Sequence, residues 1–312
     1  MRKRILGLLF TVLLIIGINY YSTLINNVDT ISMNYVDEAS SELFLSKEII
    51  LDEAVAISDL LYFGGRFILL DRENSQLYTL STEQTDNLVP LIIENVNTPT
   101  SINCDSSGNL TIIDTKESKL LMVNPNFEVF EEYDLVNHKI SDKLLLNHCL
   151  VGNYLYYTQM NMDVNQFGLS IINLKSQSSA KRLKDYLGNL SFINNTLYLA
   201  NSFKLEEFGD ELSMVSGNSQ ILNIDSETPQ FAYKLPDILS PVNLVYWRGN
   251  YLSGCLGNQS IMGFDFNENQ VYPIYKFNTE VGQLGMIACN DNGILINLPD
   301  QSKLLWLIER EK

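Results

Sequence analysis

The stretch PTSINCDSSGNLTIIDTKESKLLMV, residues 99–123, holds three short apolar runs separated by tight turn signals. The pair Gly108-Asn109 separates the first two runs, and the polar residues after Asp114 separate the second from the third. Glycine and asparagine tolerate the positive φ that two-residue turns between antiparallel strands require. The stretch therefore predicts three consecutive antiparallel strands rather than a helix.

Similar turn pairs recur along the chain at a nearly constant distance. The pairs are Gly64-Gly65, Gly108-Asn109, Gly152-Asn153, Asn194-Asn195, Gly249-Asn250 and Asn292-Gly293, with steps of 44, 44, 42, 55 and 43 residues. Each pair lies between apolar runs, and a third and usually a fourth run follow before the next unit. Four short strands per unit, with no long helical period, predict an all-β, six-bladed β-propeller over residues 44–312.

The ends of the predicted ring complement each other. The sixth unit has only three strands before the chain stops at Lys312, whereas residues 44–51, FLSKEIIL, form a strand with no partner ahead of the first unit. We expect residues 44–51 to supply the outer strand of the sixth blade, which removes an exposed sheet edge. An open β-sandwich array or two separate β domains are the alternatives.

The second unit resembles the NHL-type and TolB-like six-bladed propeller repeats. The resemblance rests on Pro99, on the Asp105-x-x-Gly-Asn turn and on Asp114-Thr115 after the second strand. Leu70-Asp71 followed by Gln76-Leu77-Tyr78 is a weaker copy in the first unit. The resemblance covers residues 44–312 and implies a fold rather than a function, because such propellers include enzymes, scaffolds and sensors.

The N-terminus carries a basic cluster followed by an apolar segment. Arg2, Lys3 and Arg4 precede an uncharged stretch, residues 5–27, whose core at 5–18 is almost wholly apolar. This pattern predicts a cytoplasmic tip and transmembrane signal-anchor over residues 1–25, a stalk over 26–43, and a single-pass cell-membrane protein with an extracytoplasmic propeller. A cleaved signal peptide and a buried N-terminal helix are the alternatives, although no A-x-A-like site follows the apolar run.

The charge of the chain is strongly acidic. Its 21 Lys and Arg stand against 37 Asp and Glu, a net charge of −16. Without the three basic residues of the N-terminal tip, 18 cations remain and the exported part carries −19. Nucleic acid is therefore not an expected partner, because phosphate binding needs a basic patch.

Polar side chains share one register on the predicted inner strands. Five residues before the first turn residue stand Asp59, Asn103, Asn147 and Asn189, while Asn243 is one place off in the fifth unit. Because first strands line the axis of a propeller, we expect a polar ring facing the channel. Such a ring would suit a hard cation such as Ca²⁺, water or a polar ligand. A polar residue facing a wet channel is the simpler interpretation, and no resident cofactor is expected.

Lactonase-like six-bladed enzymes are a further resemblance at the level of the propeller. The resemblance implies a channel metal held by carboxylates and asparagines, to which Glu53 and Asp59 would contribute. No complete ligand set can be matched, so the metal remains unknown.

The cysteines and histidines favour structural roles. Cys104–Cys149 and Cys255–Cys289 are the pairings that neighbouring units would allow, but all four cysteines lie in apolar strands, which favours free thiols. His138 lies in a polar segment between units and is expected on the surface. His148 lies in a strand and is expected in the core.

An insertion marks the fourth unit, as its 55-residue step shows. The excess lies at residues 203–218, FKLEEFGDELSMVSGN, between the second and third strands, with a shorter counterpart at 160–167. Long loops on a rigid scaffold often carry binding, although a tolerated insertion is the simpler interpretation. The candidate contact residues for a partner are Phe203, Glu206, Glu207, Phe208, Asp210, Glu211 and Met214.

These observations favour binding over catalysis. Two histidines serve the whole chain, and no G-x-S-x-G motif occurs. We expect a module that binds a protein, a peptide or an envelope component on its loop face. The alternatives are a metal-dependent, lactonase-like hydrolase and an accessory subunit of a redox or maturation enzyme.

Overall fold

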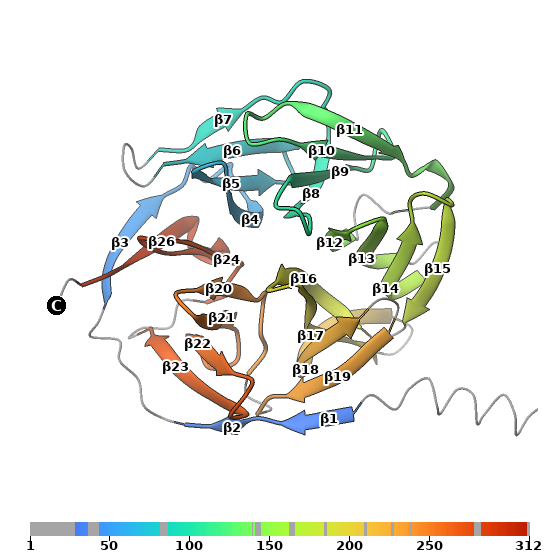
Figure 1. The fold of residues 1–312 in the computed structure, drawn as a ribbon. Coiled ribbons are helices and arrows are strands. Elements are labelled where there is room, and N and C mark those ends of the chain that lie inside the picture. The colour runs from blue at the N-terminus through green and yellow to red at the C-terminus, as the bar shows by residue number, and fades with distance from the viewer. Residues whose placement is uncertain are drawn as a thin grey trace, which may run out of the picture.

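In the described residues, six sheets surround a central axis in a closed ring, four of them wholly antiparallel and two with a parallel outermost strand (Figure 1). The computed structural model describes residues 29–36, 44–81, 87–138, 140, 145–161, 166–183, 186–208, 211–225, 228–236, 239–277 and 282–310. Each sheet is one blade whose first strand lies innermost. The predicted six-bladed β-propeller is therefore confirmed.

The first three blades follow the chain in order, each written from the axis outward. Blade 1 contains β4 (Ile57–Phe63), β5 (Arg66–Asp71), β6 (Gln76–Leu80) and β7 (Val89–Leu91). Blade 2 contains β8 (Pro99–Cys104), β9 (Leu110–Asp114), β10 (Lys119–Val123) and β11 (Val129–Asp134). Blade 3 contains β12 (Leu145–Val151), β13 (Tyr154–Asn161), β14 (Gln166–Asn173) and β15 (Ser178–Leu183).

The other three blades each use strands from more than one part of the chain. Blade 4 contains β16 (Leu187–Ile193), β17 (Thr196–Phe208), β18 (Glu211–Asp225), β19 (Thr228–Lys234) and β1 (Asp29–Ser32). Blade 5 contains β20 (Val245–Trp247), β21 (Asn250–Cys255), β22 (Ser260–Asp265), β23 (Gln270–Lys276) and β2 (Asn34–Tyr35). Blade 6 contains β24 (Ile287–Asn290), β25 (Gly293–Leu298), β26 (Lys303–Glu309) and β3 (Phe44–Ile50).

The ring is closed by pairing between the two ends of the propeller. Strand β3 lies antiparallel to β26, from Phe44 opposite Glu309 to Ile50 opposite Lys303. Residues 44–51 were expected to complete the sixth blade, and this pairing confirms it.

Two of the six predicted turn pairs have the backbone conformation of a type I′ turn, and a third such turn lies one residue earlier than predicted, at Arg248-Gly249 with φ of 48° and 88°. At Gly108-Asn109 and Gly152-Asn153 only the glycine has a positive φ, and at Asn292-Gly293 neither residue does. Gly64 and Gly65 have φ of 58° and 81°, and Asn194 and Asn195 have φ of 50° and 62°. Both central residues of a type I′ turn need such values, and glycine and asparagine adopt them at the lowest cost.

Strands β1 and β2 add a fifth strand to blades 4 and 5. Strand β1 runs parallel to β19, and β2 runs parallel to β23. Between them, Met33 is 5% exposed and packs in the apolar cluster shared by these two blades. The sequence analysis interpreted residues 26–43 as a stalk. The described part of that segment is instead bound to the propeller rim.

The predicted membrane anchor, residues 1–25, lies outside the described residues. Within the part of the chain that the structure describes, no helix has the length and apolar character needed to cross a membrane.

The hydrophobic core is divided among the blade interfaces. One cluster of buried apolar side chains lies at each of the six junctions between neighbouring blades. In the cluster between blades 5 and 6, Phe44 of the closing strand packs against Trp247 and Tyr275, at ring-centroid distances of 6.0 and 6.2 Å. The closing strand therefore contributes to packing as well as to sheet pairing.

Replacing Phe44 by alanine should destabilise the ring where its ends meet. We expect Phe44→Ala to lower the free energy of unfolding by about 3–5 kcal/mol, because it removes a buried aromatic ring and leaves a cavity. Urea denaturation measures this loss. The control is Leu45→Ala in the same strand, where the side chain is 51% exposed and the change should stay within about 0.5 kcal/mol. Equal losses in the two variants would contradict the role given to Phe44.

Candidate functional site

The Asp and Asn side chains of the predicted register form bridges between neighbouring blades. Asp59 Oδ2 accepts a hydrogen bond from Ile102 N of blade 2 at 3.2 Å. Asn103 Nδ2 donates to His148 O of blade 3 at 2.5 Å. Each side chain thus reaches the inner strand of the next blade.

The same pattern continues around the other half of the ring. Asn147 Oδ1 accepts from Leu190 N at 3.1 Å, and Asn189 Nδ2 donates to Val242 O at 2.7 Å. Asn243 makes two bonds with the backbone of Ile287, one to its carbonyl and one from its N–H, both 2.9 Å long. These contacts extend the chain of bridges from blade 3 to blade 6.

Asn297 closes the circle. It lies on β25, the second strand of blade 6, and its Nδ2 donates to Ile57 O of blade 1 at 2.8 Å. Gly285 makes room for it, because a Cβ at that position would lie 2.7 Å from Asn297 Nδ2. We refer to the six bridging residues as the Asx ring: Asp59, Asn103, Asn147, Asn189, Asn243 and Asn297.

Asn297 was not predicted from the sequence, because the inner-strand register of the sixth unit falls on Ile287. The glycine at 285, just ahead of that strand, was the available signal for a side chain arriving from a neighbouring strand. Such a signal is weak on its own, since glycines in strands also mark bulges.

Each side chain of the Asx ring uses at least one polar atom for a bond to the next blade, and the buried Oδ1 of Asn297 has no hydrogen-bond partner among the described residues. Asp59 is the only carboxylate of the ring, is 1% exposed, and lies 3.8 Å from Arg72 Nη2. Glu53, the other proposed ligand, is exposed and precedes β4. Among the residues that the structure describes, no three His, Cys, Asp or Glu side chains gather as a metal site would require. The residues present therefore do not fit the lactonase-like channel metal.

Asp59 and Arg72 form an ion pair within blade 1. Burial raises the pKa of Asp59 to about 6, while the charge of Arg72 and the bond from Ile102 act in the opposite direction. Arg72 also donates to Leu145 O of blade 3 at 2.5 Å, so its side chain ties blade 1 to blade 3.

His148 is buried in a network of hydroxyl groups. Its Nδ1 lies 2.8 Å from Ser101 Oγ, and its Nε2 lies 3.0 Å from Thr111 Oγ1. Burial lowers the pKa of His148 to about 3, so the ring is neutral at ordinary pH. The expected core position of His148 is confirmed.

His138, in contrast, was expected on the surface and is 6% exposed. It ends the short helix η2 (Val136–His138), and its Nε2 lies 3.2 Å from Gln177 Oε1 of blade 3. The surrounding polar residues wrongly predicted a surface position, because the connection between blades 2 and 3 turns the His138 side chain inward.

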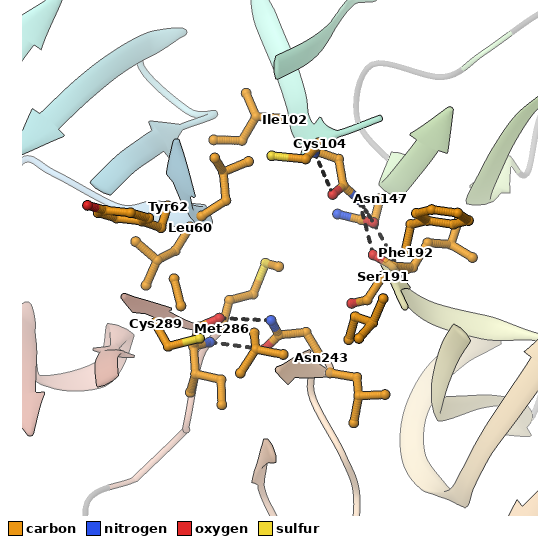
Figure 2. A pocket seen from close by; sticks show the side chains of 18 residues that line it. Leu60, Tyr62, Ile102, Cys104, Asn147, Ser191, Phe192, Asn243, Met286 and Cys289 are labelled. Carbon is orange, nitrogen blue, oxygen red and sulfur yellow. Dashed lines mark hydrogen bonds between the residues drawn. The ribbon is translucent and has the colours of Figure 1, made fainter. Parts of the chain in front are cut away.

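A pocket of about 210 Å³ lies on the channel axis, next to the Asx ring and on the side of the first turns (Figure 2). Asn103, Asn147 and Asn243 contribute to it, whereas Asp59 and Asn189 do not. Its other lining residues come from the inner strands and are mostly apolar: Leu60, Leu61, Tyr62, Ile102, Cys104, Leu190, Ser191, Phe192, Ile193, Leu244, Val245, Met286, Ile287, Ala288 and Cys289.

The pocket carries no ionised side chain at neutral pH. Its lining contains no Asp, Glu, Lys, Arg or His. Burial raises the pKa of Cys104 and of Cys289 to about 12, so both are thiols. All four cysteines of the chain are free, as the sequence analysis favoured.

The insertion of the fourth unit is a β-hairpin rather than a loop. Strands β17 and β18 continue beyond the blade and pair as far as Phe208 opposite Glu211. Asp210 lies outside the described residues. Because β17 runs away from the first turn of its blade, the hairpin projects from the face opposite the pocket.

The Asx ring should be a measurable source of stability. We expect Asn243→Ala to lower the free energy of unfolding by about 3 kcal/mol, since it leaves two buried backbone groups of Ile287 without partners. The exposed Asn267→Ala in blade 5 is the control and should change little. Differential scanning calorimetry on both variants distinguishes the outcomes, and a loss below about 1 kcal/mol for Asn243→Ala would reject the bridging role.

His148 should make the protein sensitive to acid. The pKa of His148 is 6.5 in the unfolded chain and about 3 in the folded protein. Between these two pH values the imidazole is protonated in the unfolded chain and neutral in the folded protein. Unfolding should therefore become easier as pH falls through this range, by up to about 1.4 kcal/mol per pH unit. Asp59 contributes the opposite slope between its ordinary pKa of 3.8 and about 6, because its folded form holds the proton more tightly.

The variant His148→Gln keeps hydrogen-bonding capacity and removes the titration. Comparing its urea-unfolding free energy with that of the wild type from pH 7 to pH 4 isolates the histidine, since Asp59 is present in both. The two curves should converge as the pH falls. Parallel curves would show that His148 does not titrate between folded and unfolded states.

No protein-family profile matches the sequence, and no curated protein sequence matches it. Solved structures with the same fold do exist. Virginiamycin B lyase from Staphylococcus aureus has 13% sequence identity and a TM-score of 0.55, over 86% of this chain and 100% of the lyase chain. A gluconolactonase from Xanthomonas campestris has 10% identity and a TM-score of 0.56, over 85% of this chain and 90% of its own. At these identities the similarity shows the six-bladed β-propeller fold.

Proposed function

We propose that this chain is a membrane-anchored, extracytoplasmic propeller whose central pocket binds an apolar side chain of a protein or peptide partner. The observation that carries the proposal is the pocket beside the Asx ring, with its uncharged and mostly apolar lining. Apolar walls with a few fixed polar groups are the usual composition of a binding pocket.

The size of the pocket favours a side chain over a complete small molecule. Pockets for drug-sized ligands measure about 300–1,000 Å³. The pocket here holds about 210 Å³, which suits one inserted group whose remaining contacts lie outside it. A peptide or protein surface provides such a group together with those further contacts.

The Asx ring supports binding because it fixes the walls of the pocket. The inner strands that line it are tied to one another by the bridges of Asn103, Asn147 and Asn243. A pocket that is already formed loses little entropy when a ligand enters, which favours affinity.

The membrane location rests on the N-terminal sequence. The cations of residues 2–4 would stay in the cytoplasm, and the apolar residues that follow would span the bilayer. The propeller would then be exported, with its pocket facing extracytoplasmic partners.

The hairpin of blade 4 offers a second contact surface on the opposite face. Its candidate residues are Phe203, Glu206, Glu207, Phe208, Asp210, Glu211 and Met214. A partner that used both faces would have to reach around the rim, so we assign primary recognition to the pocket.

The pocket is tested by selecting linear peptides from a phage-displayed library on the full-length protein in detergent. Peptides enriched on the wild type should share an apolar residue. They should bind Ser191→Trp at least about tenfold more weakly, because the indole would fill the pocket, a difference of about 1.4 kcal/mol. Ser107→Trp, on an exposed turn of blade 2, is the matched control. Selected peptides that bind Ser191→Trp and the wild type equally would overturn the proposal.

A hairpin variant assigns binding to one face or the other. Replacing residues 205–214 by Asn-Gly leaves Lys204 opposite Val215 as the last pair and closes it with a type I′ turn. The selected peptides should bind this variant as well as the wild type. A loss of binding here, with Ser191→Trp unaffected, would place recognition on the hairpin.

A further inference from the structure

The N-terminal segment shows how an extended chain can bind the outer rim of this propeller. Residues 29–36 cross from blade 4 to blade 5, parallel to the outer strands of both blades. Their backbone N–H groups donate to three rim carbonyls: Met33 N to Lys234 O, Asn34 N to Asn269 O, and Val36 N to Val271 O, at 2.9, 2.8 and 2.9 Å. The side chain of Met33 is buried at the crossing point.

The junction of blades 1 and 2 repeats the geometry of this rim without a covering strand in the described chain. Strands β7 and β11 end their sheets and follow each other along the rim (Figure 1). Ile92 on blade 1 corresponds to Lys234 on blade 4. Both lie at the end of an outer strand, and the residue that follows each of them, Ile93 and Leu235 respectively, is buried. We call this surface the β7–β11 junction.

The start of the second outer strand also corresponds between the two junctions. Phe127 and Asn269 both have positive φ, of 64° and 53°, two residues before Val129 and Val271. The carbonyls of Ile92, Phe127 and Val129 are therefore the counterparts of the three that accept bonds from residues 33–36. Leu91 and Val129 pack on one apolar cluster, as their counterparts Tyr233 and Val271 do at the other junction.

The β7–β11 junction differs in exposing large apolar side chains. Ile92 is 89% exposed, Val89 is 54% exposed and Phe130 is 50% exposed. Phe130 falls at an irregularity in the pairing of β10 with β11, outside the one-to-one register. Three exposed apolar side chains on the outer strands of two neighbouring blades are typical of an interaction surface.

Acidic side chains surround these apolar groups. Glu94, Glu128, Glu131, Glu132 and Asp134 are all exposed along the two blades. Lys119, bonded to Glu132 at 2.7 Å, is the cation paired with this group. A partner segment with basic residues beside its apolar residue would complement the charge.

We propose that the β7–β11 junction binds an extended segment of a partner protein, with an apolar residue flanked by lysine or arginine. The segment adds a parallel strand across the two blades and places its apolar side chain beside Ile92 and Phe130. This is recognition by strand addition, in which backbone bonds give affinity and the inserted side chain gives specificity. The β7–β11 junction is separate from the axial pocket, so this proposal does not depend on the function proposed for the pocket.

The test is an array of synthetic octapeptides with a central Met, Leu or Ile and varied flanks, probed with the full-length protein in detergent. Peptides with basic flanks should bind best. Phe130→Ser and Ile92→Ser should each weaken that binding about tenfold, as loss of a central interface residue does. Glu131→Lys should weaken it as well, and raising the salt concentration should reduce it in the wild type.

Two matched variants serve as controls. Ile50→Ser replaces an apolar side chain that is 67% exposed, between Phe130 and Ile92 in exposure, on the outer strand of blade 6, and should leave binding unchanged. Ser191→Trp should also leave it unchanged, which separates this surface from the pocket. Failure of every array peptide to bind, or binding that survives Phe130→Ser, would overturn the proposal. Analytical ultracentrifugation provides a further check. If the wild type sediments as a dimer and Phe130→Ser as a monomer, the junction binds a second copy of this chain and the proposal is overturned.

Discussion

The inner strand of each blade has one edge that does not pair with another strand of its own sheet. Near the axis six such edges converge, and their N–H and C=O groups are too deeply placed to be left without partners. Side-chain amides and one carboxylate meet this requirement by bonding to the backbone of the next blade, from Asp59 to Ile102 and onward to Asn297 and Ile57. The packing of apolar clusters between blades and the shape of the axial pocket both depend on the spacing that these bridges impose.

The same arrangement explains which parts of the molecule were visible in the sequence. Turn pairs such as Gly64-Gly65 report a local backbone requirement, and their regular steps therefore predicted six blades and the closing role of residues 44–51. The register of Asp59, Asn103, Asn147 and Asn189 was also visible, and Asn103 and Asn147 do line the axial pocket, but the bonds to the next blade were not predicted. An amide on an inner strand can face the channel or reach sideways to the next blade, and only the strand twist decides between the two.

Features that depend on distant parts of the chain were missed. Residues 29–36 mix polar and apolar side chains and resemble a linker, yet they bind as strands because blades 4 and 5 present open outer edges. Asn297 joins the ring from a second strand, where no register pointed to it. His138 lies in a polar stretch and is nevertheless turned inward by the connection between blades 2 and 3.

The strands β1 and β2 also bear on the orientation of the propeller. If residues 1–25 span a bilayer as proposed, only three residues separate that span from Asp29, which is already held on blade 4. Fully extended, that tether covers about 10–15 Å. A tether of that length would keep the rim of blades 4 and 5 close to the lipid headgroups. Blades 1 and 2, on the far side of the ring in Figure 1, would then be the part of the propeller farthest from its attachment to the membrane.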